Sequence, residues 1–190
     1  MVTLLGLWLP VLVSAVLVFV ASSVIHMCLP IHKVDYRGVP NEPELLAALR
    51  KQGLEPGGYV FPAAACMKDM NSPEILEKYN QGPVGFLTVI PSGPPAMGKS
   101  LVQWFLFSIL IGIFVAYVAT LGGLARGAAF GPVFRLTGTV AILGYAATHL
   151  PDSIWKGSKW SSTWKFVGDG IVYGLLTGAA FGWLWPSAAA

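Results

Sequence analysis

Four long apolar runs limit what this chain can fold into. They cover about residues 4–27, 101–121, 133–150 and 166–185. A helix of about 20 apolar residues is long enough to span the hydrocarbon core of a bilayer. The composition agrees, because 11% of the residues are charged, whereas soluble domains average about 25%. We therefore expect an all-α integral membrane protein with four transmembrane helices, built as a single membrane domain over residues 1–190.

The first run lies where a secretory signal peptide would lie. No Lys or Arg precedes it, and its apolar stretch is longer than the core of a typical signal peptide. We expect a helix that is retained in the membrane.

Residues 31–100 form an extended polar segment between the first two runs. Asn41 is placed to cap a short helix, and Pro73 is placed to begin a second one. Tyr59–Phe61 and the β-rich run Val84–Ile90 can pair as two strands. This pattern predicts a small cytoplasmic α+β insert between the first and second membrane helices.

The positive charges predict an orientation. Of the 12 lysines and arginines, all except Arg126 and Arg135 lie in the loops that separate runs one and two or runs three and four. The positive-inside rule places both of these loops in the cytoplasm and both termini outside it, which in a bacterium means the inner membrane. The net charge of +3 is small and dispersed, so nothing indicates nucleic-acid binding.

Glycines recur at every fourth position in the last run, at Gly170, Gly174, Gly178 and Gly182. This spacing places them on one stripe of a helix, and small residues let membrane helices approach closely. A similar stretch at 123–131 carries Gly123, Gly127 and Gly131. We expect both stripes to serve helix packing, either within the chain, in a homo-oligomer or in a larger membrane complex, with the lipid bilayer around them.

Ionisable residues near the ends of the last two runs are candidates for transport or proton binding, because such residues are costly inside a membrane. The candidates are His149 and Asp169, with Tyr145 and Tyr173 about one turn deeper. A His–Asp pair can hold a proton or a cation. Two structural alternatives stay open, since Asp169 can instead cap the last helix and His149 can lie among the lipid head groups.

Gly93–Ser100 matches the phosphate-loop pattern GxxxxGK[ST]. Such a loop binds phosphate through backbone N–H groups, and Pro94 and Pro95 have none. No parallel sheet is predicted around it. We therefore expect no nucleotide site and interpret Lys99 as an anchor at the head groups.

Four side chains with metal-binding chemistry occur early in the chain: His26, Cys28, His32 and Cys66. Their spacing matches no established zinc motif, and the two cysteines form neither a CxxC pair nor a disulfide framework. We expect no metal site and no cofactor.

No catalytic residues can be named, because the sequence has no GxSxG, HExxH or CxxC motif. This absence favours a non-enzymatic role. We predict a small multi-pass membrane protein that acts as a structural or accessory subunit and packs through its glycine stripes. Two alternatives stay open: a small oligomeric transporter or channel subunit that uses His149 and Asp169, and a lipid-acting membrane enzyme.

Overall fold

The computed structural model describes residues 2–188. The chain is mostly helical and divides into two compact units. The helical unit comprises residues 2–36, 96–154 and 158–188, and the insert unit comprises residues 37–95 and 155–157.

Four α-helices form the framework of the helical unit: α1 (Trp8–Ser23), α4 (Met97–Leu121), α5 (Phe130–Ala146) and α7 (Trp160–Trp183). Short segments extend them, namely Leu5–Leu7 before α1, a π-turn at Val24–Cys28 and a 3₁₀ turn at Pro30–His32 after it, and a 3₁₀ turn at Ala147–His149 after α5. The last of these leads into α6 (Leu150–Lys156).

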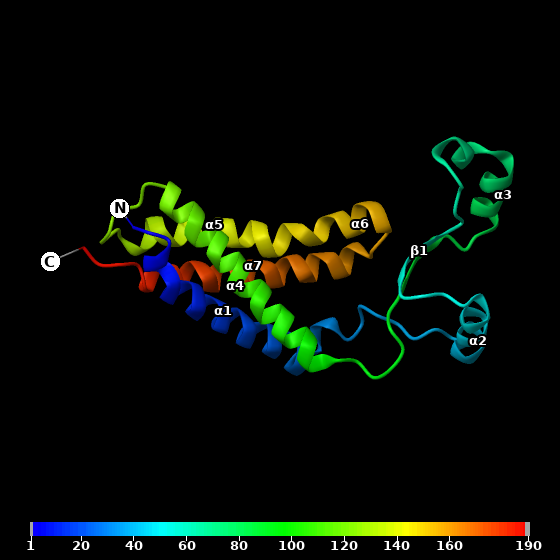
Figure 1. Cartoon of the computed structure of the whole chain (residues 1–190), viewed down its shortest axis with the longest axis horizontal. Coiled ribbons are helices and arrows are strands. Elements are labelled where there is room, and N and C mark those ends of the chain that lie inside the picture. The colour runs from blue at the N-terminus through cyan, green and yellow to red at the C-terminus, as the bar shows by residue number, and fades with distance from the viewer. Residues whose placement is uncertain (1, 189–190) are drawn as a thin grey trace. The chain divides into compact units, whose positions relative to one another are not determined.

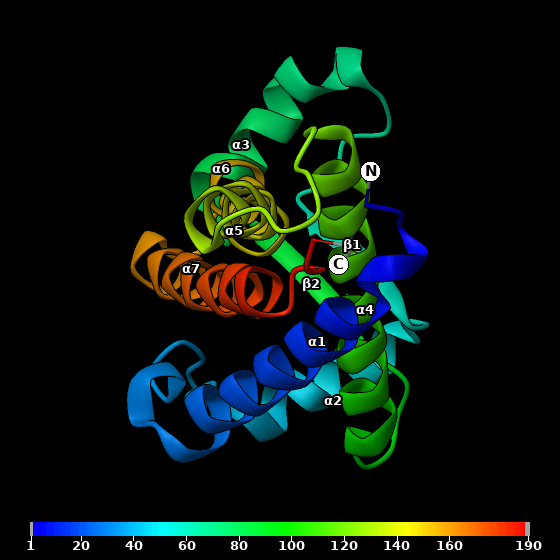
Figure 2. The ribbon, with the colours of Figure 1, turned by 90° about the vertical axis from the view of Figure 1, so that its left-hand side faces the viewer.

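The four framework helices close into a ring. Helix α5 packs on α7, α7 on α1, α1 on α4, and α4 returns to α5 (Figures 1 and 2). Each side of this ring contributes fully buried apolar side chains to a shared core. They include Leu7 just before α1, Val115 of α4, Val133 of α5 and Phe181 of α7. The apolar runs therefore supply both this core and the large apolar side chains that remain exposed on the outside.

Within the described residues, two helices are long and apolar enough to cross a membrane, Leu5–Cys28 and Met97–Leu121. Only 33% and 28% of their most apolar windows are buried inside the protein. Apolar helices that leave most of their surface uncovered are suited to contact with lipid.

The contact between α5 and α7 explains the glycine stripe of the last apolar run. A Cβ atom added at Gly170, Gly174, Gly178 or Gly182 would lie within 3 Å of Ala146, Ile142, Phe134 or Phe130, respectively. The residue numbers of the contacts on α5 fall as the residue numbers of the glycines on α7 rise, so the two helices run antiparallel. Because glycine has no side chain, the two backbones can approach closely. The glycine stripe of α7 therefore serves helix packing within the chain.

The second set of glycines lies in a different setting. Gly123 and Gly127 belong to the connector between α4 and α5 and have φ angles of 70° and 74°. Glycine adopts this left-handed conformation without steric cost. Gly131 lies in the first turn of α5, where an added Cβ would meet nothing within 4 Å.

The insert unit contains two short helices, α2 (Glu42–Gln52) and α3 (Pro73–Gln81), a 3₁₀ turn at Met67–Asn71, and two strands. Strand β1 (Gly57–Phe61) pairs antiparallel with β2 (Gly85–Val89), with Tyr59 opposite Leu87. The predicted pairing is confirmed, and so is Pro73 as the first residue of its helix. Asn41 lies at the N-cap of α2 as predicted, but its side chain contacts Glu44 and caps no backbone N–H.

The last helix begins earlier than its apolar run suggests. Helix α7 starts at Trp160, so Trp160, Trp164 and Lys165 lie in its first turns. Asp169 therefore lies about two and a half turns inside α7, and the idea that it caps the last helix is wrong.

Candidate functional site

Two histidines are brought together where the chain leaves α1. His26 lies in the π-turn that ends the helix, and Leu29 then adopts an extended conformation before Pro30, as residues that precede proline prefer. The 3₁₀ turn Pro30–His32 folds the chain back, so the rings of His26 and His32 lie 4.4 Å apart.

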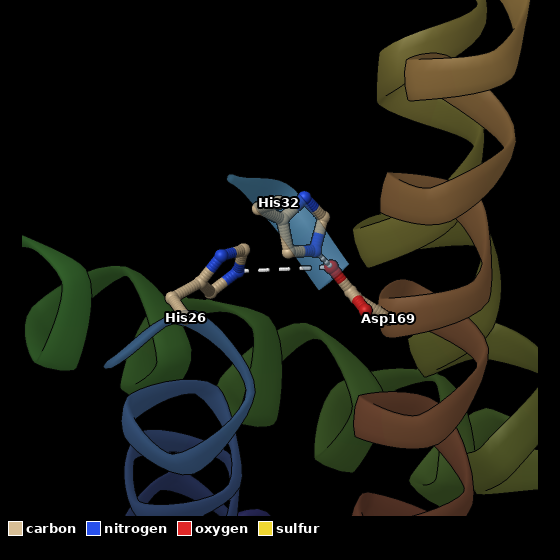
Figure 3. A group of neighbouring side chains, drawn as sticks. All are labelled: His26, His32 and Asp169. Carbon is tan, nitrogen blue, oxygen red and sulfur yellow. Dashed lines mark ion pairs between the residues drawn. The ribbon is translucent and has the colours of Figure 1, made fainter. Parts of the chain in front are cut away.

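Asp169 of α7 points at both histidines, as Figure 3 shows. Its Oδ2 atom lies 2.9 Å from His32 Nε2 and 3.6 Å from His26 Nε2. One ligand-capable atom from each of the three residues lies within 4.8 Å of the other two. Ligand atoms that surround a tetrahedral Zn²⁺ ion lie about 3.3 Å apart, because each is about 2.0–2.2 Å from the ion.

A second carboxylate holds His32 from the opposite side of its ring. His32 Nδ1 lies 2.7 Å from Asp35 Oδ2. When Nδ1 carries the proton that Asp35 accepts, Nε2 presents its lone pair to Asp169. The carboxylate–histidine arrangement is the one that orients histidine ligands in many metal sites.

Asp35 is itself fixed by helix α7. Its Oδ1 atom accepts hydrogen bonds from Lys165 Nζ at 2.7 Å and from Ser162 Oγ at 2.8 Å. The hydrogen bond from Lys165 is the main cause that lowers the pKa of Asp35 to about 2. Lys165 also donates to the carbonyl of Ile31. Asp35 is therefore a charged acceptor, paired with a lysine, across the physiological pH range.

Asp169 pairs with His26 and His32 rather than with a lysine. Asp169 is 8% exposed, and neither its Oδ2 atom nor His32 Nε2 makes a hydrogen bond within the described part of the chain. A buried carboxylate is costly unless it is paired or coordinates a cation. The 2.9 Å separation of His32 Nε2 and Asp169 Oδ2 suits a proton shared between them, and a metal ion held by both atoms would need them to move apart to about 3.3 Å.

Aromatic side chains surround the three residues. The ring of Phe166 stacks on His32 at 4.8 Å and on His149 at 5.1 Å. The hydroxyl of Tyr173 lies 3.4 Å from His26 Nε2. Tyr173 also packs edge-on against Tyr145, which is 4% exposed.

All four polar candidates from the sequence thus lie in one region, but the pairing differs from the expected one. Asp169 pairs with His26 and His32, whereas His149 stacks on Phe166. The contact of Asp169 with His26 and His32 was not predicted from the sequence. The signal that links them is that the stretch with His26 and His32 follows the first apolar run and Asp169 lies near the start of the last one, so the predicted orientation puts both on the same side of the membrane.

The two cysteines do not join the cluster. Cys28 and Cys66 are both free and exposed. Cys66 lies in the insert unit, where its thiol donates to Asp69 at 3.2 Å.

The phosphate-loop match has no phosphate-loop surroundings. Lys99 is exposed in the first turn of α4. The strand that precedes the match, β2, belongs to the two-stranded antiparallel sheet. The parallel sheet in which such loops occur is not found among residues 2–188.

A cavity of about 440 Å³ adjoins the cluster and lies between α1, α4 and α7. His26 and Asp169 form one part of its wall, and the rest is mainly apolar. His149 and Tyr173 also line it.

No protein-family model, no curated protein and no solved structure matches this chain.

Proposed function

We propose that this chain is a four-span membrane protein that binds a divalent transition-metal ion of the zinc class through His26, His32 and Asp169. The observation that carries the proposal is the convergence of His32 Nε2 and Asp169 Oδ2 at 2.9 Å, with neither atom hydrogen-bonded within the described residues. Two imidazoles and one carboxylate are a common ligand set for zinc and for other first-row metals.

The charges around the cluster favour the binding of a cation. Lys165 compensates the carboxylate of Asp35, so Asp169 is the acidic group that needs a counter-charge. A metal ion would neutralise it and would use the lone pairs of both histidines. Asp35 would act on His32 from behind, by fixing its ring and raising the basicity of Nε2.

The membrane part of the proposal rests on the ring of helices. Helices α1 and α4 are apolar enough to span a bilayer, and α5 and α7 pack with them around one core. We propose that all four helices cross the membrane and that the positive-inside rule sets both termini outside the cytoplasm. The metal site then lies near the cytoplasmic ends of α1 and α7.

Isothermal titration of the purified protein in lipid nanodiscs with Zn²⁺ tests the proposal. We expect one Zn²⁺ ion per chain, with micromolar or tighter affinity, and no binding of Mg²⁺, which prefers oxygen ligands. His32→Ala removes a ligand and should lower the affinity for Zn²⁺ by about 100-fold or more.

His149→Ala is the matched control, because His149 stacks on the same Phe166 ring but is not one of the three clustered ligands. It should bind Zn²⁺ like the wild type. An equal loss in both variants, or no binding by the wild type, would overturn the proposal.

The roles predicted from the sequence stay predictions beside this proposal. A homo-oligomer or a larger membrane complex would need a surface other than the glycine stripe of α7, which faces α5. A small oligomeric transporter or channel subunit that uses His149 and Asp169, and a lipid-acting membrane enzyme, stay predictions.

A further inference from the structure

We propose that the cavity beside the cluster binds an amphiphile whose oxygen-bearing head group coordinates the metal ion and whose apolar part lies between α1, α4 and α7. This inference rests on the proposed metal site and names the class of ligand that the site takes.

The ligand set leaves room for such a head group. Three protein ligands leave the fourth position of a tetrahedral ion open, and catalytic or substrate-binding zinc sites use this arrangement. Two of the three ligands, His26 and Asp169, also line the cavity. The side chain of His26 is 39% exposed, so the cluster can be reached from outside the protein.

The size and the lining of the cavity fit an apolar chain. Its volume of about 440 Å³ lies in the range of small-molecule sites, about 300–1,000 Å³. Met97, Leu101 and Trp104 of α4 line the cavity, together with Met27 and Phe166. Methionine side chains adapt to ligands of different shape, and Met27 and Met97 are 76% and 63% exposed.

The polar groups elsewhere in the lining are already used. Trp104 Nε1 donates to Ser22 Oγ at 2.8 Å, and the hydroxyls of Ser22 and Ser23 donate to the carbonyl of Phe19. A polar ligand would find few free donors along this wall. The groups that can recognise a polar atom are His26, Asp169, Tyr173 and His149, and they gather around the cluster, since Tyr173 reaches His26 and His149 shares the Phe166 ring with His32. The ligand that fits is therefore polar at one end and apolar along the rest.

A two-part probe tests this inference. Octanohydroxamic acid carries a metal-chelating head and an apolar tail, acetohydroxamic acid carries the head with almost no tail, and octanamide carries the tail with a weak head. The protein is loaded with Co²⁺ in phosphatidylcholine nanodiscs, and the visible spectrum of Co²⁺ reports coordination by the head group. We expect octanohydroxamic acid to bind at least about tenfold more tightly than acetohydroxamic acid, because its tail removes apolar surface from water in the cavity. Octanamide should leave the spectrum unchanged.

Leu101→Trp fills the cavity and is the informative variant. It should keep the wild-type affinity for Zn²⁺ and for acetohydroxamic acid but lose the advantage of the octyl tail. Leu110→Trp is the matched control, because Leu110 lies on the same helix, is 48% exposed and does not line the cavity. It should behave like the wild type.

The outcomes separate the two proposals. If the wild type binds Zn²⁺ but the octyl tail adds no affinity, or if Leu101→Trp keeps the tail's advantage, the amphiphile inference is overturned and the metal site stands. If the wild type binds neither Zn²⁺ nor Co²⁺, both proposals fall.

Discussion

His32 lies between two carboxylates, one near each of its ring nitrogens. Asp35 holds one ring nitrogen at 2.7 Å, and Asp169 faces the other at 2.9 Å. The stabilisation that Asp35 gains from Lys165 is present above the ordinary pKa of 3.8 and is lost only as the pH falls through about 2. The support behind His32 therefore persists in weakly acidic solution.

We expect Asp35→Asn to lower the affinity for Zn²⁺ by about 10- to 100-fold, because an amide neither orients the ring as strongly nor raises the basicity of Nε2. Titration calorimetry on the variant in nanodiscs measures this change. Glu74→Gln is the control, because Glu74 forms an exposed ion pair with Lys78 in the insert unit, and it should bind like the wild type. Unchanged affinity in Asp35→Asn would show that Asp35 plays no positioning role.

At the scale of elements, the contact between α5 and α7 depends on small residues on α7. A Cβ atom at Gly174 would clash with Ile142 Cγ1 and would lie 2.7 Å from the backbone nitrogen of the same residue. Since backbone atoms cannot move aside as a flexible side chain can, the two helices would have to separate.

Gly174→Ala should therefore destabilise the protein by about 1–3 kcal/mol, which is the usual cost of overpacking a core. Gly168→Ala on the same helix is the matched control, because an added Cβ there meets nothing within 4 Å. It should be neutral or stabilise α7 by up to about 1 kcal/mol. Thermal unfolding in detergent, followed by circular dichroism, compares the two. Equal stability of both variants would contradict close packing of α5 on α7.

The same contact influences the site. Helix α7 carries Asp169, Lys165 and Phe166, and its stripe of glycines holds it against α5 while its neighbouring face meets α1. The position of Asp169 relative to His26 therefore depends on how closely the helices pack.

At the scale of the whole molecule, the proposed orientation can be measured by cysteine labelling in intact cells. With the native cysteines replaced by serine, Arg126→Cys should react with a membrane-impermeant maleimide added outside. Lys159→Cys should react only after the membrane is permeabilised, because α5 separates the two positions. Reaction of both cysteines from the same side would contradict a membrane-crossing α5.

Much of the architecture followed from local patterns. The two runs that are apolar throughout became helices Leu5–Cys28 and Met97–Leu121. In the insert, α3 begins at Pro73, and Gly53 ends α2 with a φ of 62°. Such signals act over a few residues, since a proline, a glycine or an apolar period changes the backbone where it stands.

The boundaries of α7 were harder to predict, because Trp160, Trp164 and Lys165 favour an interfacial segment as much as a helix. In the folded protein this segment is helical, and its lysine has hydrogen-bond partners. Lys165 binds Asp35 and the carbonyl of Ile31, and these partners lie at the other end of the chain.

The sequence by itself determined the mostly helical fold, the two most apolar helices, the small two-stranded sheet and the residues that are capable of binding a cation. Only the tertiary structure decided which of those residues meet. Asp35 and Lys165 are 130 positions apart, and Asp169 could have faced His149 just as well by local criteria. Two features determine that Asp169 faces His26 and His32. The glycines of α7 allow it to pack closely on α5, and the turn after α1 places His32 beside α7. The glycine period predicts that α7 packs closely on another helix, but no local pattern tells which helix becomes its neighbour.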